Sequence, residues 1–497
     1  MPRRNRATRS PVLPQVASAG VEGGRFRPLR SSEVDKIVSA AFDILEGIGI
    51  ADAPGELARD LVLRGAKLSP EGRLCFPRSF VEDAVARAPG CVELPGFAGN
   101  TGLVIGQRRV HIGTGGAAVQ VLGPNGSQFR DATLADLLTL MQVLETSPNI
   151  DYGVRPVIAR DISDPLALDV NTAFACLKGT AKPIGVSFQS PENLDAVVSM
   201  FDLALGADGA FRRQPFCMGV IVHVVPPLRF APDGIEILQT CVRAGMIPQI
   251  CSAGQAGATS PVTLAGALAQ GLAECLAGLM VVDHVRRGAP CIYALMPFVS
   301  DLRTGAMTGG GGEGAIASAA AAQLLAHLGL PSTVSAGMTD AKIADAQAGY
   351  EKGYTVALAA HAGANMINLS VGMLGSIMVA SPEVMVIDDD MCGAIMRSVR
   401  GIEVSDDALD IETIRRVASG PGHYLGESQT LARMKTDYVY PRLADRRSVA
   451  EWQAAGSPGL LDRAAARVRE VVADPPGHLD RAAEARIRNS FPIHLPE

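Results

Sequence analysis

The sequence predicts an α/β protein built as a closed (β/α)8 barrel of the TIM type, and three observations predict it. Between about residues 110 and 400, short apolar, β-branched runs alternate eight times with longer helical patterns. The runs are continuously apolar rather than alternating, which is typical of parallel strands covered on both faces. The chain also holds 53 Gly and 32 Pro, enough for the many turns that repeated strand–loop–helix units need. Eight successive units favour a closed barrel over an open sheet.

Two segments precede the predicted barrel. Residues 1–30 begin with Arg3, Arg4, Arg6 and Arg9 and contain no long apolar stretch, so we expect a flexible arm and no secretory signal. Residues 31–109 predict a helical extension with mixed elements, because the apolar positions after Ser31 follow helical spacing. Short runs at 73–76 and 91–94 indicate a minor sheet.

The barrel is expected over residues 110–400, followed by a helical segment over 401–497. The expected strands are 119–122, 152–158, 184–188, 216–222, 247–251, 290–295, 331–335 and 365–371. The expected helices are 133–146, 165–179, 191–206, 232–244, 262–286, 313–328, 345–362 and 381–398. The charged C-terminal segment predicts helices at 406–417, 429–435 and 460–472, which pack on the barrel or on a second subunit, and we expect a homo-oligomer.

Composition excludes several functional classes. The 497 residues carry a net charge of −6 without a compact basic patch, which argues against nucleic-acid binding. No uninterrupted apolar run reaches 18 residues, so no transmembrane helix is expected. Nine cysteines without a CxxC pair indicate reduced, buried thiols in a cytoplasmic protein. No cluster has metal-ligand spacing, so no intrinsic metal is expected.

The candidate site centres on the polar loop after the seventh predicted strand. The polar side chains of this stretch lie close together in the sequence, and βα barrels place their chemistry in such loops. They are Asp340, Lys342, Asp345, Gln347 and Glu351. The alternative is a solvated loop with Asp345 capping the next helix. Sequence spacing alone leaves both interpretations open.

Other candidate residues lie in glycine-rich turns and at strand ends. Segments 113–116, with Gly113, Thr114 and Gly115, and 309–312 expose backbone N–H groups that suit an anion, although either segment is also compatible with a mobile loop. Gln189 and His223 stand near the ends of the third and fourth strands, and His223 is equally compatible with a structural role.

Several ordered stretches together resemble the trimethylamine methyltransferase (MttB) family of corrinoid-dependent methyltransferases, between about residues 110 and 455. They are PPLRF (226–230), GATSPVTLAGALAQGLAECLAG (257–278), GAPCIYALMPFVSDLRTGAM (288–307), Glu313 in the glycine-rich turn, TDAKIADAQAGYEKG (339–353), AGANMI (362–367), GPGHYLG (420–426) and YPRLADRRSVAEW (440–452).

The resemblance implies a (β/α)8 barrel and methyl transfer from a methylated amine to a Co(I) cobalamin that a separate corrinoid protein carries. It also implies catalytic roles around Asp340, Lys342, Gln347 and Glu313. Two features depart from the family. Trimethylamine enzymes use pyrrolysine, which this chain lacks, so it resembles the subgroup of glycine betaine methyltransferases and their relatives. Gln429-Thr430 stands where the family often has His-Thr.

A quaternary amine also fits the chemistry. Its leaving group is a neutral tertiary amine, so no protein acid is needed, and the protein's task is positioning and desolvation. Aromatic faces would hold the cation, and the candidates for this cage are Phe97, Phe188, Phe298, Tyr350 and Tyr354.

Glycine betaine is the first expected substrate, with carnitine and proline betaine as rivals. The alternatives are a non-catalytic protein that binds quaternary amines and an unrelated barrel lyase or aldolase.

Overall fold

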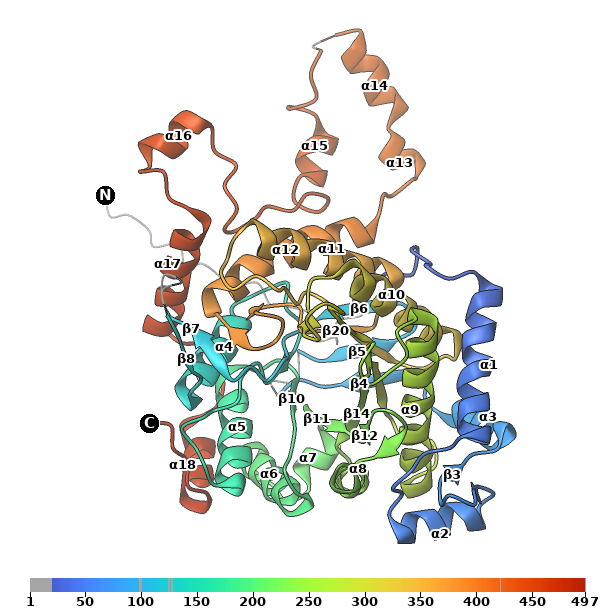
Figure 1. The fold of residues 1–497 in the computed structure, drawn as a ribbon. Coiled ribbons are helices and arrows are strands. Elements are labelled where there is room, and N and C mark those ends of the chain that lie inside the picture. The colour runs from blue at the N-terminus through green and yellow to red at the C-terminus, as the bar shows by residue number, and fades with distance from the viewer. Residues whose placement is uncertain (1–19, 98–100, 124–125, 127, 421, 497) are drawn as a thin grey trace.

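A parallel barrel of eight strands forms the centre of the computed structural model, which describes residues 20–97, 101–123, 126, 128–420 and 422–496 (Figure 1). Its strands are β6 (Arg109–Ile112), β9 (Gly153–Val154), β10 (Ile184–Val186), β11 (Cys217–Val222), β14 (Ile247–Ser252), β16 (Ile292–Leu295), β19 (Ser332–Ser335) and β20 (Met366–Asn368). They pair in ring order from β20 and β6 at one end of the sheet to β10 and β9 at the other. A parallel bridge between Gly113 and Tyr152 joins the two ends, so the ring closes as predicted.

Eight helices surround the barrel and match the predicted ones within a few residues. They are α4 (Leu134–Glu145), α5 (Pro165–Gly179), α6 (Pro191–Leu205), α8 (Pro232–Ala244), α9 (Leu264–Val285), α10 (Gly312–His327), α11 (Ala346–Ala362) and α12 (Pro382–Arg400), with the short α7 (Ala210–Arg213) between α6 and β11. Side-chain caps begin many of them, because a side-chain oxygen satisfies a backbone N–H that the first turn leaves free. Thr133, Ser190 and Ser381 do this at α4, α6 and α12.

Helix α9 has the length and apolar composition of a membrane span, but 89% of its most apolar window is buried inside the fold. Its hydrophobicity therefore serves the core between the barrel and the N-terminal helices. It packs on α1 (Ser31–Gly47), α3 (Arg78–Arg87) and α8.

The expectation for the first barrel strand was wrong. Residues 119–122 predicted that strand, but β7 (Gln120–Leu122) belongs to a separate four-stranded sheet with β8 (Phe129–Asp131), β21 (Met373–Leu374) and β22 (Val379–Ala380). The barrel strand is β6, which pairs with β20. Both segments are short and apolar, and only the pairing partner distinguishes them. The correction moves the turn at 113–116 from before a barrel strand to its carboxyl end.

The amino-terminal end of the barrel is closed by a hairpin of β4 (Cys91–Leu94) and β5 (Leu103–Gly106). Its inward side chains pack with the lowest layer of the barrel, at about 1.5–3 kcal/mol for each fully buried large apolar side chain. The cluster consists of Val92, Leu94, Leu103, Ile105, Tyr152, Val154, Met218, Ile247, Ile292 and Met366. Among the described residues, the barrel is therefore closed at the amino-terminal end and open at the carboxyl ends of its strands.

The N-terminal extension is helical with small strands, as expected. It contains α1, α2 (Gly55–Leu63), β2 (Lys67–Leu68), β3 (Leu74–Cys75) and α3. Of the expected flexible arm, residues 1–19 lie outside the described residues. Residues 20–30 lie against the barrel, where β1 (Val21–Glu22) pairs antiparallel with β6 and the backbone of Phe26 donates to the His361 carbonyl.

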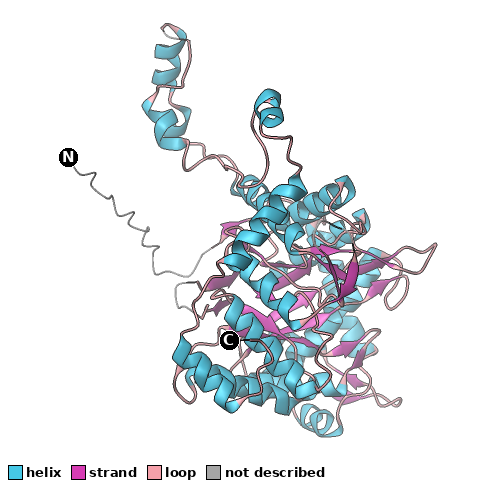
Figure 2. Ribbon diagram, turned by 90° about the vertical axis from the view of Figure 1, so that its left-hand side faces the viewer, coloured by secondary structure: helices cyan, strands magenta, loops and turns pink. Residues whose placement is uncertain are grey.

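The C-terminal segment has two parts. Helix α17 (Leu460–Ala473) packs on α12 and α4, and α18 (Arg481–Ser490) packs on α6. Helices α13 (Asp406–Leu409), α14 (Ile411–Ala418) and α15 (Ser428–Arg433) instead project from the body, and α16 (Val449–Ala454) forms a second, smaller projection (Figures 1 and 2).

Candidate functional site

A cavity of about 450 Å³ lies at the open end of the barrel. Connections that follow three neighbouring barrel strands, β14, β16 and β19, form its walls. Acidic side chains dominate its charge, because its one arginine, Arg303, is paired with Asp301. The lining residues are Ala256, Val262, Leu264, Val299, Ser300, Asp301, Leu302, Arg303, Thr308, Gly310, Gly311, Glu313, Asp340 and Glu351. Three of them, Glu313, Asp340 and Glu351, leave a net negative wall that suits a cation.

Asp340 ties three connections of the mouth together. Its carboxylate accepts the backbone N–H of Gly309 at 2.7 Å and the hydroxyl of Ser376 at 2.7 Å. These partners belong to the turn before α10 and to the connection after β20, whereas Asp340 itself follows β19. The side chain therefore holds the glycine-rich turn in place beside the cavity.

Glu351, on the first turns of α11, is the buried centre of this polar cluster. Its carboxylate accepts the backbone N–H of Asp340 at 2.8 Å, the Gln347 side-chain amide at 2.9 Å and the Thr339 hydroxyl. A Cβ at position 310 would overlap this carboxylate, which explains the glycine there. The glycine-rich turn is thus needed for close approach to an acidic group. The predicted Asp340 and Gln347 meet around Glu351, which belongs to the same predicted polar cluster.

A buried ion pair fixes the neighbouring backbone. Lys352 and Asp388 are almost fully buried, with 3.2 Å between the ammonium and the carboxylate. Lys352 also donates to the carbonyls of Gly337 and Met373, and Asp388 accepts the N–H of Gly372. Burial raises the pKa of Asp388 to about 6, although Lys352 opposes this shift. The pair locks the connections after β19 and β20 onto α11 and α12.

Arg155 carries a positive charge on the side of the ring opposite β16, outside the residues that line the cavity. It directly follows β9, and its guanidinium donates to the Ser187 hydroxyl, next to β10, at 3.2 and 3.4 Å. No carboxylate of the described residues forms an ion pair with it, and burial lowers its pKa although Asp169 opposes this. Asp169, on α5, is the main anion acting on this partly buried cation, and it compensates the charge without a direct ion pair. The sequence argument missed Arg155, because it lies in the middle of the predicted strand 152–158, whereas β9 ends at Val154.

A hydrogen-bonded belt crosses the barrel below the mouth. The Tyr152 hydroxyl donates to the Asn368 carbonyl oxygen at 2.6 Å, and the Asn368 amide donates to Gln249 at 3.1 Å. Gln249 in turn donates to the Thr333 hydroxyl at 2.8 Å. These four side chains come from four parts of the ring and are almost fully buried. They form a polar layer whose hydrogen bonds are satisfied, and it lies above the apolar cluster that closes the amino-terminal end of the barrel.

The remaining predicted residues are placed differently from one another. Tyr354 donates to the Gly310 carbonyl beside the cavity, and Phe298 packs inside the mouth with Cys251, Ala294 and Met296. Tyr350 is exposed on α11, and exposed Lys342 donates to the Asp340 carbonyl. Gly113, Thr114 and Gly115 lie at the carboxyl end of β6, where Thr114 is buried and donates to the Val154 carbonyl.

Four predicted residues do not join this group. His223 faces α9, where Nε2 lies 2.9 Å from the Glu274 carbonyl oxygen and burial lowers its pKa to about 4. Phe188 packs in the main core, and exposed Gln189 binds Asp169 through its backbone. Phe97 lies at the amino-terminal end of the barrel, 5.2 Å from the Phe216 ring centroid.

The fold is a (β/α)8 barrel, and the candidate site lies at the carboxyl ends of its strands. The family model described as Trimethylamine methyltransferase (MTTB) matches residues 2–491, and the chain belongs to this family. It is a methyltransferase. In the part of the chain that the structure describes, no group of three or more His, Cys, Asp or Glu residues is placed to hold a metal ion.

Similar proteins include methyltransferases of two named substrates. The trimethylamine methyltransferase MttB of Desulfitobacterium hafniense (strain DSM 10664 / DCB-2) is 29% identical, over 90% of each chain. The glycine betaine methyltransferase of strain Y51 is 28% identical, over 93% of this chain and 96% of its own. The crystal structure of the Methanosarcina barkeri monomethylamine methyltransferase (MtmB) covers 92% of this chain and 95% of its own at 11% identity, with a TM-score of 0.51. That likeness confirms the barrel fold.

Proposed function

We propose that this protein transfers a methyl group from a small quaternary amine with a carboxylate, glycine betaine first, to a Co(I) corrinoid carried by a separate protein in the cytoplasm. The observation that carries the proposal is the arrangement of charge around the barrel ring. Asp340, Glu351 and Glu313 lie on the side of β16 and β19, and Arg155 lies on the opposite side of the ring. This polarity matches a zwitterion, whose cation turns toward the acidic wall and whose carboxylate turns toward the arginine.

The chain's own groups position the amine and exclude water. The acidic wall and the ring of Phe298 favour the trimethylammonium group, at roughly 0.5–2 kcal/mol for a ring contact. The Asp340 and Glu351 links keep the glycine-rich turn fixed, so the bound amine has a defined orientation. No proton transfer is required of any residue, because the N–C electron pair leaves with a neutral tertiary amine.

The corrinoid would approach from outside the barrel. A cavity of about 450 Å³ accommodates a small amine but not a corrin ring. When bound, the Co(I) corrinoid supplies the nucleophile for the methyl carbon. Apolar side chains that are 52–65% exposed stand at the end of β11 and in the strand-to-helix connections around the mouth, and they suit a docking protein. They are Val222, Val225, Val262, Leu302 and Met378.

The test is corrinoid methylation with glycine betaine, choline and trimethylamine side by side, followed by visible absorbance. Glycine betaine should be the best methyl donor, and choline, which lacks the carboxylate, should be poor. Preference for choline or trimethylamine would refute the assigned substrate within the confirmed family. Higher rates with carnitine or proline betaine would support a zwitterionic substrate but replace glycine betaine with a larger one. Betaine binding without any methylation would instead favour a non-catalytic binding protein.

A further inference from the structure

The arm formed by residues 401–437 has no hydrophobic core of its own. It contains α13, α14 and α15, and among the described residues of these helices only Val417 is buried. Eight of the arm's large apolar side chains are 45–84% exposed: Ile402, Val404, Leu409, Ile411, Ile414, Tyr424, Leu425 and Leu431. An isolated segment of this size cannot bury enough surface to remain folded alone. Its apolar surface therefore calls for a partner.

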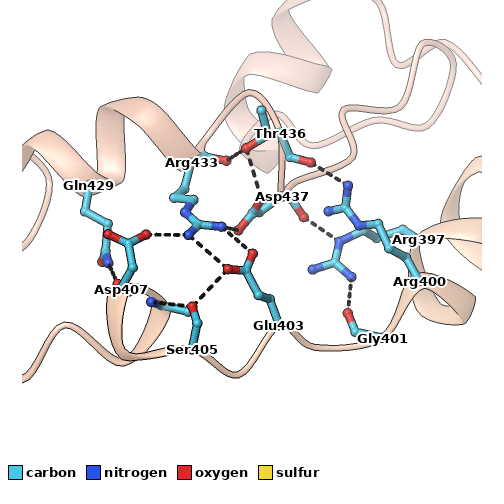
Figure 3. Close-up of polar contacts among 11 residues, drawn as sticks. Arg397, Arg400, Gly401, Glu403, Ser405, Asp407, Gln429, Arg433, Thr436 and Asp437 are labelled. Atoms are coloured by element: carbon cyan, nitrogen blue, oxygen red, sulfur yellow. Dashed lines mark hydrogen bonds and ion pairs between the residues drawn. The ribbon is translucent and has the colours of Figure 1, made fainter.

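The arm is nevertheless held in one shape. Arg433 forms ion pairs with Glu403 at 2.6 Å and Asp407 at 2.7 Å, and it also lies near Asp437 (Figure 3). Arg400, at the end of α12, donates to the Thr436 carbonyl at 2.7 Å. This bond anchors the segment after α15, where the chain returns to the body. These ion pairs neutralise the charge of Arg433 inside the arm, and apolar side chains face outward. A defined shape with an apolar exterior is typical of an interface element.

The position of the arm separates it from the open end of the barrel. Helix α12 begins beside the mouth, where Ser381 donates its backbone N–H to the Gly372 carbonyl. It runs antiparallel to the strands and ends past the opposite side, where Ser398 bonds to His361 at 2.9 Å. The arm starts at residue 401 and projects away from the body (Figures 1 and 2). A protein docked at the mouth would therefore leave the arm uncovered.

The same chain also provides a complementary surface. A groove of about 1040 Å³ lies between α12 and the root of the arm, lined in part by Ile387, Met391, Met434, Tyr438 and Tyr440. Two copies related by a twofold axis can each place an arm against the other's groove, because such an interface uses the same surfaces on both subunits. A standard interface buries ~800 Å² per partner, and the eight exposed apolar side chains of the arm are available to contribute to such an area.

We propose that the arm over residues 401–437 docks on a second copy of this chain, at the groove beside its α12. The contact is isologous and uses the apolar stripe of α14, Ile411 and Ile414, as its centre. It leaves the barrel mouths of both copies free. This assembly does not depend on the proposed substrate or on the corrinoid.

Light scattering coupled to size exclusion tests the proposal on the full chain over a micromolar concentration range. The wild type should have about twice the chain mass of 51.8 kDa. The double variant Ile411→Glu, Ile414→Glu should raise the dimer dissociation constant at least tenfold. Arg415→Ala, on the same helix, is the matched control and should leave the mass unchanged. Circular dichroism and thermal unfolding of each variant check that the barrel remains folded.

Arg433→Ala provides a second route to the same answer. It removes the ion pairs of Arg433 with Glu403 and Asp407 without adding charge to the apolar stripe, so the dimer should weaken while the barrel stays folded. A wild type that remains monomeric would overturn the proposal. A double glutamate variant that keeps the mass of the wild type would overturn it as well.

Discussion

At the residue scale, the polar cluster acts through geometry rather than through proton transfer. Asp340 binds two neighbouring connections, and its own backbone N–H is bound by Glu351. Its carboxylate is consumed by these bonds, so it positions the glycine-rich turn and contributes charge to the cavity wall. His223 shows the opposite case, because the period of two along β11 directs it to α9 instead of the barrel interior.

Replacing Asp340 with Ala should reduce methyl transfer more than tenfold, a loss of at least about 1.4 kcal/mol of transition-state stabilisation. The reason is that Gly309 and Ser376 lose their shared acceptor and the turn loosens. Initial rates measure this, and the thermal midpoint should change little. Asp345→Ala is the control: it removes only the cap of α11, so it should cost about 1 kcal/mol of stability and leave the rate nearly unchanged. Equal rates for Asp340→Ala and the wild type would support the alternative interpretation, in which this loop is solvated and has no role in the reaction.

Replacing Arg155 with Met should raise the KM for glycine betaine at least tenfold. The guanidinium is the cation expected to hold the carboxylate, and Met keeps part of its apolar stem. Tetramethylammonium, which lacks a carboxylate, should bind equally well to both proteins, as calorimetry or a thermal-shift titration can measure. Arg160→Met changes an exposed arginine nearby and serves as the control. Equal loss for both ligands would assign Arg155 a purely structural role.

At the element scale, helices α11 and α12 support the mouth by binding the connections that lie above them. The Lys352–Asp388 pair joins the two helices and binds backbone groups at Gly337, Gly372 and Met373. Such a buried pair contributes mainly to geometry, because desolvation offsets most of its Coulomb attraction. Removing one partner alone leaves an uncompensated buried charge.

The raised pKa of Asp388 predicts a specific pH dependence. Burial raises the pKa to about 6 in the folded state, above the ordinary value of 3.8. The folded state therefore binds more protons between about pH 4 and 6, and this group's contribution to stability falls as the pH rises through that window. The variant Asp388→Asn lacks the titration. Denaturant unfolding of both proteins from pH 4 to 7 should give a stability difference that changes most between pH 4 and 6. A difference that is flat across this range would contradict the assignment.

At the scale of the whole molecule, the two ends of the barrel have different tasks. The β4–β5 hairpin closes the amino-terminal end, and the opposite end keeps an acidic cavity with an exposed apolar rim. The proposed substrate and the proposed carrier protein would therefore share one entrance. The arm beyond the other end is free for contact between copies.

Replacing Val225 with Glu should weaken the encounter with the corrinoid protein. Val225 is 54% exposed on the rim and does not line the cavity, so the amine should bind as before. The KM for the corrinoid protein should rise at least tenfold, while a betaine thermal-shift titration stays unchanged. Val472→Glu is the matched control, because Val472 is 52% exposed on α17, away from the mouth. An unchanged KM would exclude the rim at this position as the docking surface.

The sequence by itself determined the barrel, its eight helices and the family. Local signals carry these features: apolar runs set the strands, and helical spacing with caps such as Thr133 and Ser381 sets the helices. Only the tertiary structure decided which short strand closes the ring, since β6 and β7 look alike and differ only in their partners. It also decided which candidates meet. Asp340 and Gln347 are joined by Glu351, whereas Phe97 lies at the other end, because pairing across the ring brings together residues that sequence distance cannot relate.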